Sequence, residues 1–398
     1  MQNNSLKSRR SATRPSIHSL EPRLLFSTTL GTFSGGSKLT HSLPDGTKEI
    51  FSLTTGTGTL IQDDSGNLSI TTTGTSISST LSVAVSGKTK FATLTQITTD
   101  AALGTLNLSK VNLTGGGLTI AGDSKKVSLA SVVSSALSFN GSSPLSLTLG
   151  NVSDTTVQST QPFTSLSANS FLSSAAHVSS ITAPWIGTLN CKMEFLPDLT
   201  LTGAGAPAGL ALNTANVKGD VGGSTWKIAG NVNTLNMLTG FDGFFNGCIT
   251  GNVKTLNIGN GIYGSNLAAA NLGTVKVGNG LSVARLLAGT NFGADGVLGG
   301  GDDTFAAGKI GSIKVGNTVN DSVVAGGLVL ADDENPLTSN VLTLTSDDSL
   351  LPDSSIGPIT VNNTLTANSR IVASTLPPTA KLHFKSVPTA SDSRFQLP

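Results

Sequence analysis

A six-residue phrase recurs along this chain and limits the folds that it can adopt. The phrase reads VKTLNI from Val253, LGTVKV from Leu272 and IGSIKV from Ile310, with apolar side chains at its first, fourth and last positions. The starts are 19 and then 38 residues apart, and 38 is twice 19. Short alternating strands at a fixed period of about twenty are typical of stacked coils, so the phrase predicts a β-solenoid with one such strand per period.

Related phrases extend over most of the chain. They begin at Lys125, Pro144 and Phe163, again 19 residues apart, and then at Ile186, Val232 and Ile356. Apolar residues at helical spacing do not persist over ten residues, except weakly near residues 265–270. We therefore expect an all-β fold in which residues 89–378 form a single-stranded parallel β-helix, right-handed by the usual crossover rule.

The two ends of the expected solenoid differ from its body. Residues 30–88 hold short alternating runs such as EIFSLTT and NLSITTT, separated by turn residues, which predict antiparallel strands in a cap or a small sandwich. Residues 379–398 contain no glycine, and KLHFKSV from Lys381 is the one candidate closing strand. We expect this end to form a terminal strand followed by a frayed tail.

The composition fits a solenoid with a narrow interior. Charged residues are 12% of the chain and aromatic residues 5%, while the apolar fraction is 37%, so the chain has enough aliphatic side chains to fold. The first 23 residues hold five basic side chains and one acidic one, which leaves 19 basic and 22 acidic residues in the remainder. No basic patch predicts a nucleic-acid partner, and no apolar run of about 18 residues predicts a transmembrane helix.

Glycine–asparagine pairs recur at or beside the ends of the expected strands. The pairs begin at Gly230, Gly251, Gly259, Gly278 and Gly316, and we interpret them as corners in left-handed conformations whose asparagines form a hydrogen-bonded ladder.

The two cysteines, Cys191 and Cys248, are 57 residues apart, which places them two or three coils from each other. That separation exceeds the Cα distance of about 7 Å that a disulfide allows, so we expect free, buried thiols.

The leader gives the most specific resemblance in the chain. Residues 1–29 are basic and rich in serine, and they include Leu20-Glu21-Pro22-Arg23-Leu24-Leu25-Phe26. This run resembles the LEPR-xLL leader of surface or secreted proteins of planctomycete bacteria, with Phe26 in place of the second leucine. Residues 165–190 and 293–315 are similar to the repeat region of the same proteins. The resemblance implies a secreted or cell-surface β-solenoid and no established reaction.

One glycine-rich loop contains the best candidate ligands for a metal ion. Asp295, Asp302 and Asp303 lie within nine residues of one another. Six of the nine residues from Gly293 to Gly301 are glycine or alanine. Calcium prefers several oxygen ligands on a flexible loop, so these carboxylates predict a calcium site. A solvated glycine loop is the alternative, because the spacing does not match the helix-flanked calcium loop. The loop falls within the 38-residue interval and should project from the stack.

The sequence favours a structural or adhesive protein without catalytic activity. Its expected partners are cell-surface polysaccharide or other envelope proteins. A glycan-binding module is the alternative, since Trp185, Trp226, Tyr263 and Phe241, Phe244 and Phe245 would suit sugar stacking if they were exposed rather than in the core. A β-helix polysaccharide lyase or hydrolase is the least supported reading, because acidic residues do not recur at coil spacing beside a basic residue.

Overall fold

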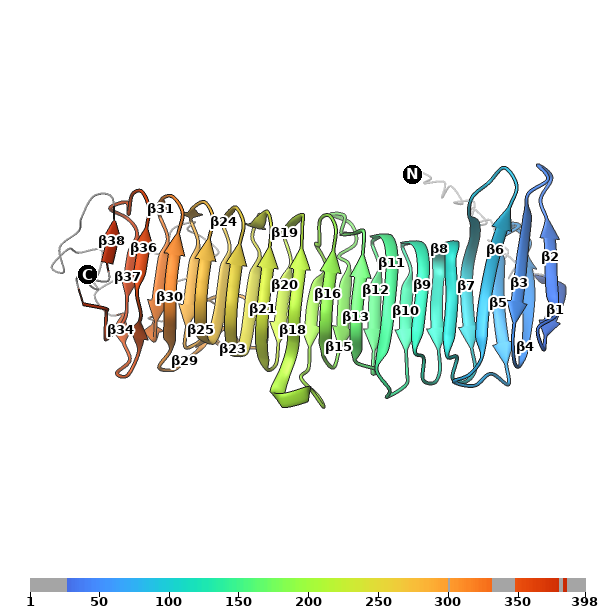
Figure 1. Cartoon of the computed structure of the whole chain (residues 1–398), viewed down its shortest axis with the longest axis horizontal. Coiled ribbons are helices and arrows are strands. Elements are labelled where there is room, and N and C mark those ends of the chain that lie inside the picture. The colour runs from blue at the N-terminus through green and yellow to red at the C-terminus, as the bar shows by residue number, and fades with distance from the viewer. Residues whose placement is uncertain (1–26, 300, 331–347, 379–381, 385–398) are drawn as a thin grey trace, which may run out of the picture.

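The chain folds into a long stack of β-coils capped by antiparallel strands at its N-terminal end (Figure 1). The computed structural model describes residues 27–299, 301–330, 348–378 and 382–384. The described residues form strands joined by turns, with one 3-10 helix at Pro207–Gly209. The leader motif at residues 20–26 and most of the C-terminal tail lie outside the described residues. The predicted all-β fold and the parallel β-solenoid are confirmed.

Antiparallel pairing is found at the N-terminal end. It joins β1 to β4, β2 to β3, β3 to β6 and β4 to β5. These strands are β1 (Ser27–Ser34), β2 (Lys38–Ser42), β3 (Lys48–Leu53), β4 (Thr57–Asp63), β5 (Leu68–Thr73) and β6 (Thr80–Ser86). Parallel pairing starts where β5 meets β7 (Ala92–Thr99) and β6 meets β8 (Thr105–Ile120). Two strands of the cap, β5 and β6, therefore pair directly with strands of the first coil.

Each coil contributes strands to three faces of the stack, which differs from the single strand per period expected from the phrase. Face 1 carries the phrase itself. Its strands are the first halves of β9 (Lys126–Val133) and β11 (Leu145–Ser153), whose second halves belong to face 2, then β13 (Phe163–Ala168), β16 (Ile186–Cys191), β18 (Leu210–Val217), β21 (Asn231–Met237), the second halves of β23 (Asn246–Ile258) and β25 (Asn266–Val277), β30 (Lys309–Val315), β35 (Ser355–Ile356), β36 (Ile359–Val361) and β38 (Leu382–Phe384).

The other two faces are built from shorter strands. Face 2 contains β14 (Ser170–Leu172), β19 (Asp220–Gly222), β22 (Gly240–Asp242), β24 (Gly261–Tyr263), β26 (Leu281–Ser282) and β31 (Val319–Asn320). Face 3 contains β10 (Ala136–Phe139), β12 (Thr156–Ser159), β15 (Ser180–Ala183), β17 (Asp198–Leu201), β20 (Thr225–Ile228), the first halves of β23 and β25, β27 (Arg285–Ala288), β32 (Val323–Gly326) and β37 (Arg370–Val372). Strands of two to four residues are too short for their period to be read from a sequence.

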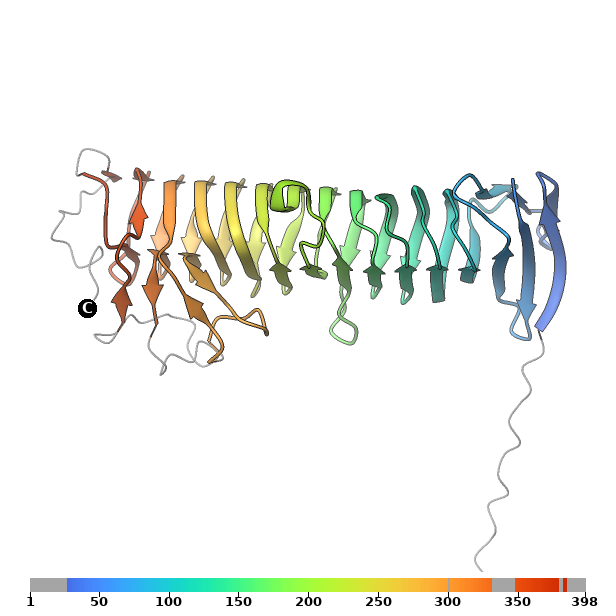
Figure 2. The ribbon, with the colours of Figure 1, turned by 90° about the horizontal axis from the view of Figure 1, so that it is seen from below.

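The 38-residue interval contains one coil and an inserted segment, not two coils. Val253 pairs with Leu272, and Leu272 pairs directly with Ile310. The extra residues leave the stack after β27 and return at β30 as residues 289–308, which include the antiparallel pair β28 (Thr290–Asn291) and β29 (Thr304–Phe305). The segment extends from the side of the stack, as predicted (Figure 2). The interval equals twice 19 only because the inserted segment happens to be as long as one coil.

Glycines at the corners are needed mainly because neighbouring coils approach closely. Of the five predicted pairs, only Gly230 has a positive φ, so the expected left-handed corners are wrong for the other four. A Cβ on Gly278 would lie 2.0 Å from the carbonyl oxygen of Gly259, and one on Gly316 would lie 1.9 Å from that of Gly278. No side chain fits between these backbones, so glycine is required whatever its φ.

The interior is a continuous apolar column with an aromatic segment at its centre. Phe171, Phe195, Trp226 and Phe245 pack in sequence with ring centroids 5.5–5.8 Å apart and nearly perpendicular planes. Edge-to-face packing of this kind stabilises buried aromatic pairs. Phe241 stacks on Phe245 at 4.2 Å. Trp226, Phe241 and Phe245 are therefore core residues and are not exposed for sugar stacking.

A second apolar cluster lies outside the stack and holds the insertions against face 3. Cys248, Ala268, Leu287 and Ala325 point away from the interior at successive register positions. Phe292 and Leu298 from residues 289–308 cover them. Leu328 belongs to the same cluster and lies in β33 (Leu328–Val329), which pairs with β34 (Ser349–Leu350). Face 3 is thus buried on both sides near the C-terminal end.

Candidate functional site

The three candidate calcium ligands lie together in the aspartate loop, residues 289–308. One oxygen of each carboxylate accepts a backbone N–H: Asp295 from Val297 at 2.8 Å, Asp302 from Ala294 at 2.6 Å, and Asp303 from Gly299 at 2.7 Å. Each aspartate therefore fixes a turn of its own loop. The second oxygen of each carboxylate takes no hydrogen bond that the structure describes, and that of Asp303 is buried.

Burial and neighbouring negative charges both raise the pKa of the Asp303 carboxyl. Desolvation raises the pKa of its carboxyl most, the hydrogen bond from Gly299 N–H lowers it, and the charges of Asp302 and Asp295 raise it further. The three carboxylates are close enough to repel one another, yet within the described residues no three acidic, histidine or cysteine side chains form a group that could hold a metal ion. Calcium binding at Asp295, Asp302 and Asp303 stays a prediction.

Titration calorimetry of the protein with calcium chloride tests that prediction. If calcium binds, the wild type should release or absorb heat with saturation, and the double variant Asp302→Asn/Asp303→Asn should lose most of it because two anionic ligands are gone. The single variant Asp45→Asn, at a turn of the N-terminal cap, serves as the control. A wild type with no calcium-dependent heat would end the idea.

The raised pKa of Asp303 also predicts a stability effect. A carboxyl whose pKa is higher in the folded state favours folding below its unfolded pKa of about 3.9, and that contribution is lost as the pH rises through the folded value. Asp303→Asn should therefore raise the melting temperature at pH 7 and change it little near pH 3.5. The exposed Asp302→Asn is the matched control, with a smaller expected shift. Equal melting of wild type and Asp303→Asn at pH 7 would contradict the argument.

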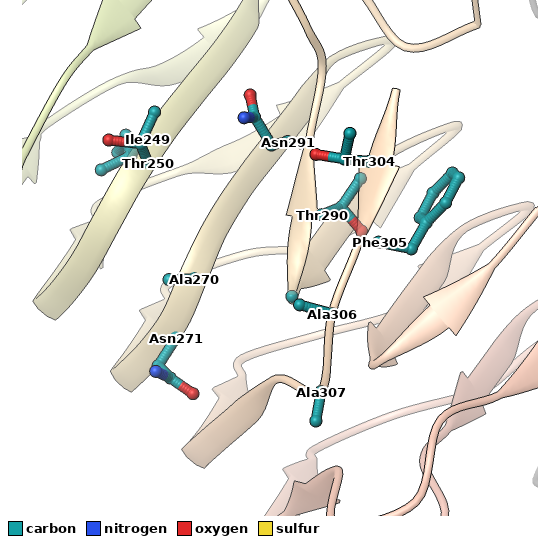
Figure 3. Close-up of a pocket in the computed structure, with 11 residues that line it drawn as sticks. Ile249, Thr250, Ala270, Asn271, Thr290, Asn291, Thr304, Phe305, Ala306 and Ala307 are labelled. Atoms are coloured by element: carbon teal, nitrogen blue, oxygen red, sulfur yellow. The ribbon is translucent and has the colours of Figure 1, made fainter. Parts of the chain in front are cut away.

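A small pocket lies between the aspartate loop and the stack (Figure 3). Its volume is about 180 Å³, and it is bounded by the β28–β29 hairpin on one side and by the corner between faces 3 and 1 on the other. The lining residues carry no charge, and Phe305 points its ring away from the opposite strands. Apart from Gly289 and the aromatic Phe305, their side chains are aliphatic groups, hydroxyls and amides. The lining residues are Ile249, Thr250, Ala270, Asn271, Gly289, Thr290, Asn291, Thr304, Phe305, Ala306 and Ala307.

Cys248 forms part of the support for the loop. Its thiol donates to Asn291 Oδ1 at 3.1 Å and accepts the N–H of Phe292 at 3.3 Å. Cys248 and Cys191 are both free and buried, which confirms the prediction from their spacing. Burial raises the pKa of both thiols, so neither is an activated nucleophile.

Several acidic side chains of the coils accept hydrogen bonds from neighbouring coils. Asp123 accepts the N–H groups of Ser142 and Ser143 at 2.6 and 2.9 Å, and these bonds lower the pKa of its carboxyl. Asp154 accepts from Ser174 N–H and Asp198 from Thr225 N–H, each about one coil or more further along the chain. Their carboxylates thus act as acceptors for backbone groups at corners.

Face 1 presents two straight columns of short polar side chains. The register places residues of the same kind above one another in successive coils. The first column is Ser146, Ser165, Thr188, Thr214, Thr234 and Thr255, and the second is Thr148, Ser167, Asn190, Asn216, Asn236 and Asn257. Neither column was recognised from the sequence as a surface, although the T-L-N triplet repeats visibly in three of the phrases.

The last four residues of the second column form an amide ladder, Asn190, Asn216, Asn236 and Asn257. Each later amide donates an Nδ2–H to the Oδ1 of the one before it, at 3.0, 2.8 and 2.8 Å. A further ladder runs along three of the predicted glycine–asparagine corners, through Asn260, Asn279 and Asn317, and continues to Asn363. The expected asparagine ladder is confirmed at these corners.

Comparison with known protein families, curated proteins and solved structures finds no match for this chain. In the part of the chain that the structure describes, no helix has the length and apolar character needed to cross a membrane.

Proposed function

We propose that this protein is a structural or adhesive β-solenoid of the cell surface or extracellular space, which binds other surface components and catalyses no reaction. The observation that carries the proposal is face 1, where equivalent polar side chains repeat over six coils. Many equivalent contacts along one face give a high total affinity from individually weak bonds. A surface of this kind suits attachment to an extended partner.

The stack has features that keep such a face straight. Asparagine ladders connect successive coils on face 1 and at a corner, and the apolar interior continues from the cap to β37. Because each coil contacts mainly its neighbours, bonds between coils determine how stiff the rod is. The resemblance of residues 20–26 to a planctomycete leader supports a secreted or cell-surface location.

A glycan-binding module is the second candidate, and the uncharged hydroxyl and amide groups of face 1 favour it. The full chain should be tested on a glycan array with calcium and with chelator, and on an isolated bacterial envelope fraction. Retention on the envelope fraction supports the adhesive function, and binding of defined sugars favours the module. New reducing ends or unsaturated products from acidic polysaccharides would instead support a β-helix enzyme. A chain that binds none of these surfaces would contradict the proposal.

A further inference from the structure

We propose that the amide ladder of face 1 binds an uncharged, hydroxyl-rich polysaccharide that lies along the axis of the stack, over Asn216, Asn236 and Asn257 and against Leu238. This inference rests on the proposed surface-binding function and adds the chemical class of the ligand and the face that takes it. It is independent of the aspartate loop and of calcium.

The hydrogen-bonding capacity of the ladder suits hydroxyl groups. A side-chain amide has two N–H donors and two acceptor lone pairs. Asn216 and Asn236 each use one donor and one acceptor within the ladder. Each therefore presents one donor and one acceptor to the outside. A hydroxyl group both donates and accepts, so it can satisfy an amide in this state, whereas a carboxylate or sulfate group only accepts.

The charge of the surface points to the same class of ligand. The columns from Ser146 to Thr255 and from Thr148 to Asn257 contain no ionisable side chain. A lysine stands at one end of each column: Lys126 precedes Ser146 in the first, and Lys276 follows Asn257 in the second. Lys254 is exposed beside Thr255 and Lys218 lies at the groove, so the face carries isolated positive charges over the ladder but no continuous line of lysines that an acidic polymer could follow.

A groove beside the ladder supplies an apolar wall. It has a volume of about 300 Å³, and Asn216, Asn236 and Asn257 line it together with Lys218 and Leu238. Leu238 is 62% exposed, which is unusual for a large apolar side chain at the edge of a polar face. Sugar rings expose C–H groups between their hydroxyls. The exposed surface of the groove is almost entirely apolar, so Leu238 and the groove pack on those C–H groups, and the amides bind hydroxyls on the face beside it.

The length of the ladder favours a polymer over a single sugar. Neighbouring coils are about 4.8 Å apart, so the four amides of the ladder extend for roughly 14 Å. A chain of sugars lying along the axis meets the same groups in every coil that it crosses. Several weak, equivalent contacts then add to a useful affinity.

Co-sedimentation of the full chain with insoluble chitin and cellulose, and with calcium alginate as an acidic gel, tests the inference. Leu238→Asp places a negative charge at the wall of the groove and should weaken binding to the neutral polymers by about tenfold or more, since it removes the central apolar contact. Phe244→Asp is the matched control. Phe244 is 72% exposed at a corner that borders faces 2 and 3, so its variant should bind within about twofold of the wild type.

The outcomes separate this inference from the proposed function. Loss of binding in Leu238→Asp alone supports the inference, provided that thermal melting shows both variants folded. If the wild type binds the envelope fraction but neither chitin nor cellulose, or if it binds alginate better, the inference is wrong and the surface function stands. Equal binding by the two variants also overturns the inference. A wild-type dimer in sedimentation velocity that Leu238→Asp dissociates would assign the face to a second copy and overturn it as well.

Discussion

Replacing Trp226 with alanine is expected to lower the free energy of unfolding by about 3–5 kcal/mol, because the change removes the largest buried side chain of the stack and leaves a cavity. Trp226 is 1% exposed, and its ring packs edge-on against Phe195 at 5.8 Å and Phe245 at 5.5 Å. Neighbouring coils cannot fill the space without losing their strand register. Urea denaturation followed by circular dichroism measures the loss.

Phe244→Ala is the aromatic control for this experiment. Phe244 is exposed, and only the next residue, Phe245, enters the core. Its removal should therefore change the free energy of unfolding by about 0.5 kcal/mol or less. If Trp226→Ala were no more destabilising than Phe244→Ala, the aromatic column would not be a main source of stability.

Gly278→Ala should have a comparable effect for a different reason. A Cβ at this position would lie 2.0 Å from Gly259 O and 2.9 Å from Gly259 C, and both are backbone atoms that cannot rotate away. The neighbouring coil must move, which strains the hydrogen bond from Gly278 N–H to Ile258 O, now 2.8 Å. We expect a loss of about 3 kcal/mol in unfolding free energy, at the upper end for an overpacked site.

Gly205→Ala separates steric exclusion from backbone strain. Gly205 has a φ of +64°, and a Cβ there would meet no atom within 4 Å. Only the cost of the left-handed conformation remains, about 1–2 kcal/mol. Both variants are compared by the same urea titration. A smaller loss for Gly278→Ala than for Gly205→Ala would mean that close approach of the coils is not what requires glycine.

The fold could be predicted from the sequence because its longest strands repeat a visible phrase. VKTLNI and LGTVKV are adjacent on face 1, as their spacing indicates. Faces 2 and 3 were missed, since strands such as Gly261–Tyr263 are too short to show a period. The insertion after β27 had a usable signal: RLLA at Arg285–Ala288 is buried at all four positions, which is typical of a strand covered on both sides.

The candidate site was only partly accessible to sequence reasoning. The 38-residue interval predicted that the loop of Asp295, Asp302 and Asp303 lies outside the stack. A sequence cannot show that each carboxylate accepts a backbone N–H of the loop itself. The amide ladder was missed as a binding surface because its members are about twenty residues apart. Only the register of the coils reveals that Asn216, Asn236 and Asn257 form one line.

Hydroxyl-radical footprinting of the protein bound to chitin or cellulose tests the central claim that face 1 is the binding surface. Leu238 and Phe244 are reactive, exposed side chains, at 62% and 72% exposure, and they report on different sides of the stack. The account predicts that the ligand protects Leu238 and leaves the oxidation of Phe244 unchanged. Protection of Phe244 or of the aspartate loop, with Leu238 as reactive as in the free protein, would contradict it.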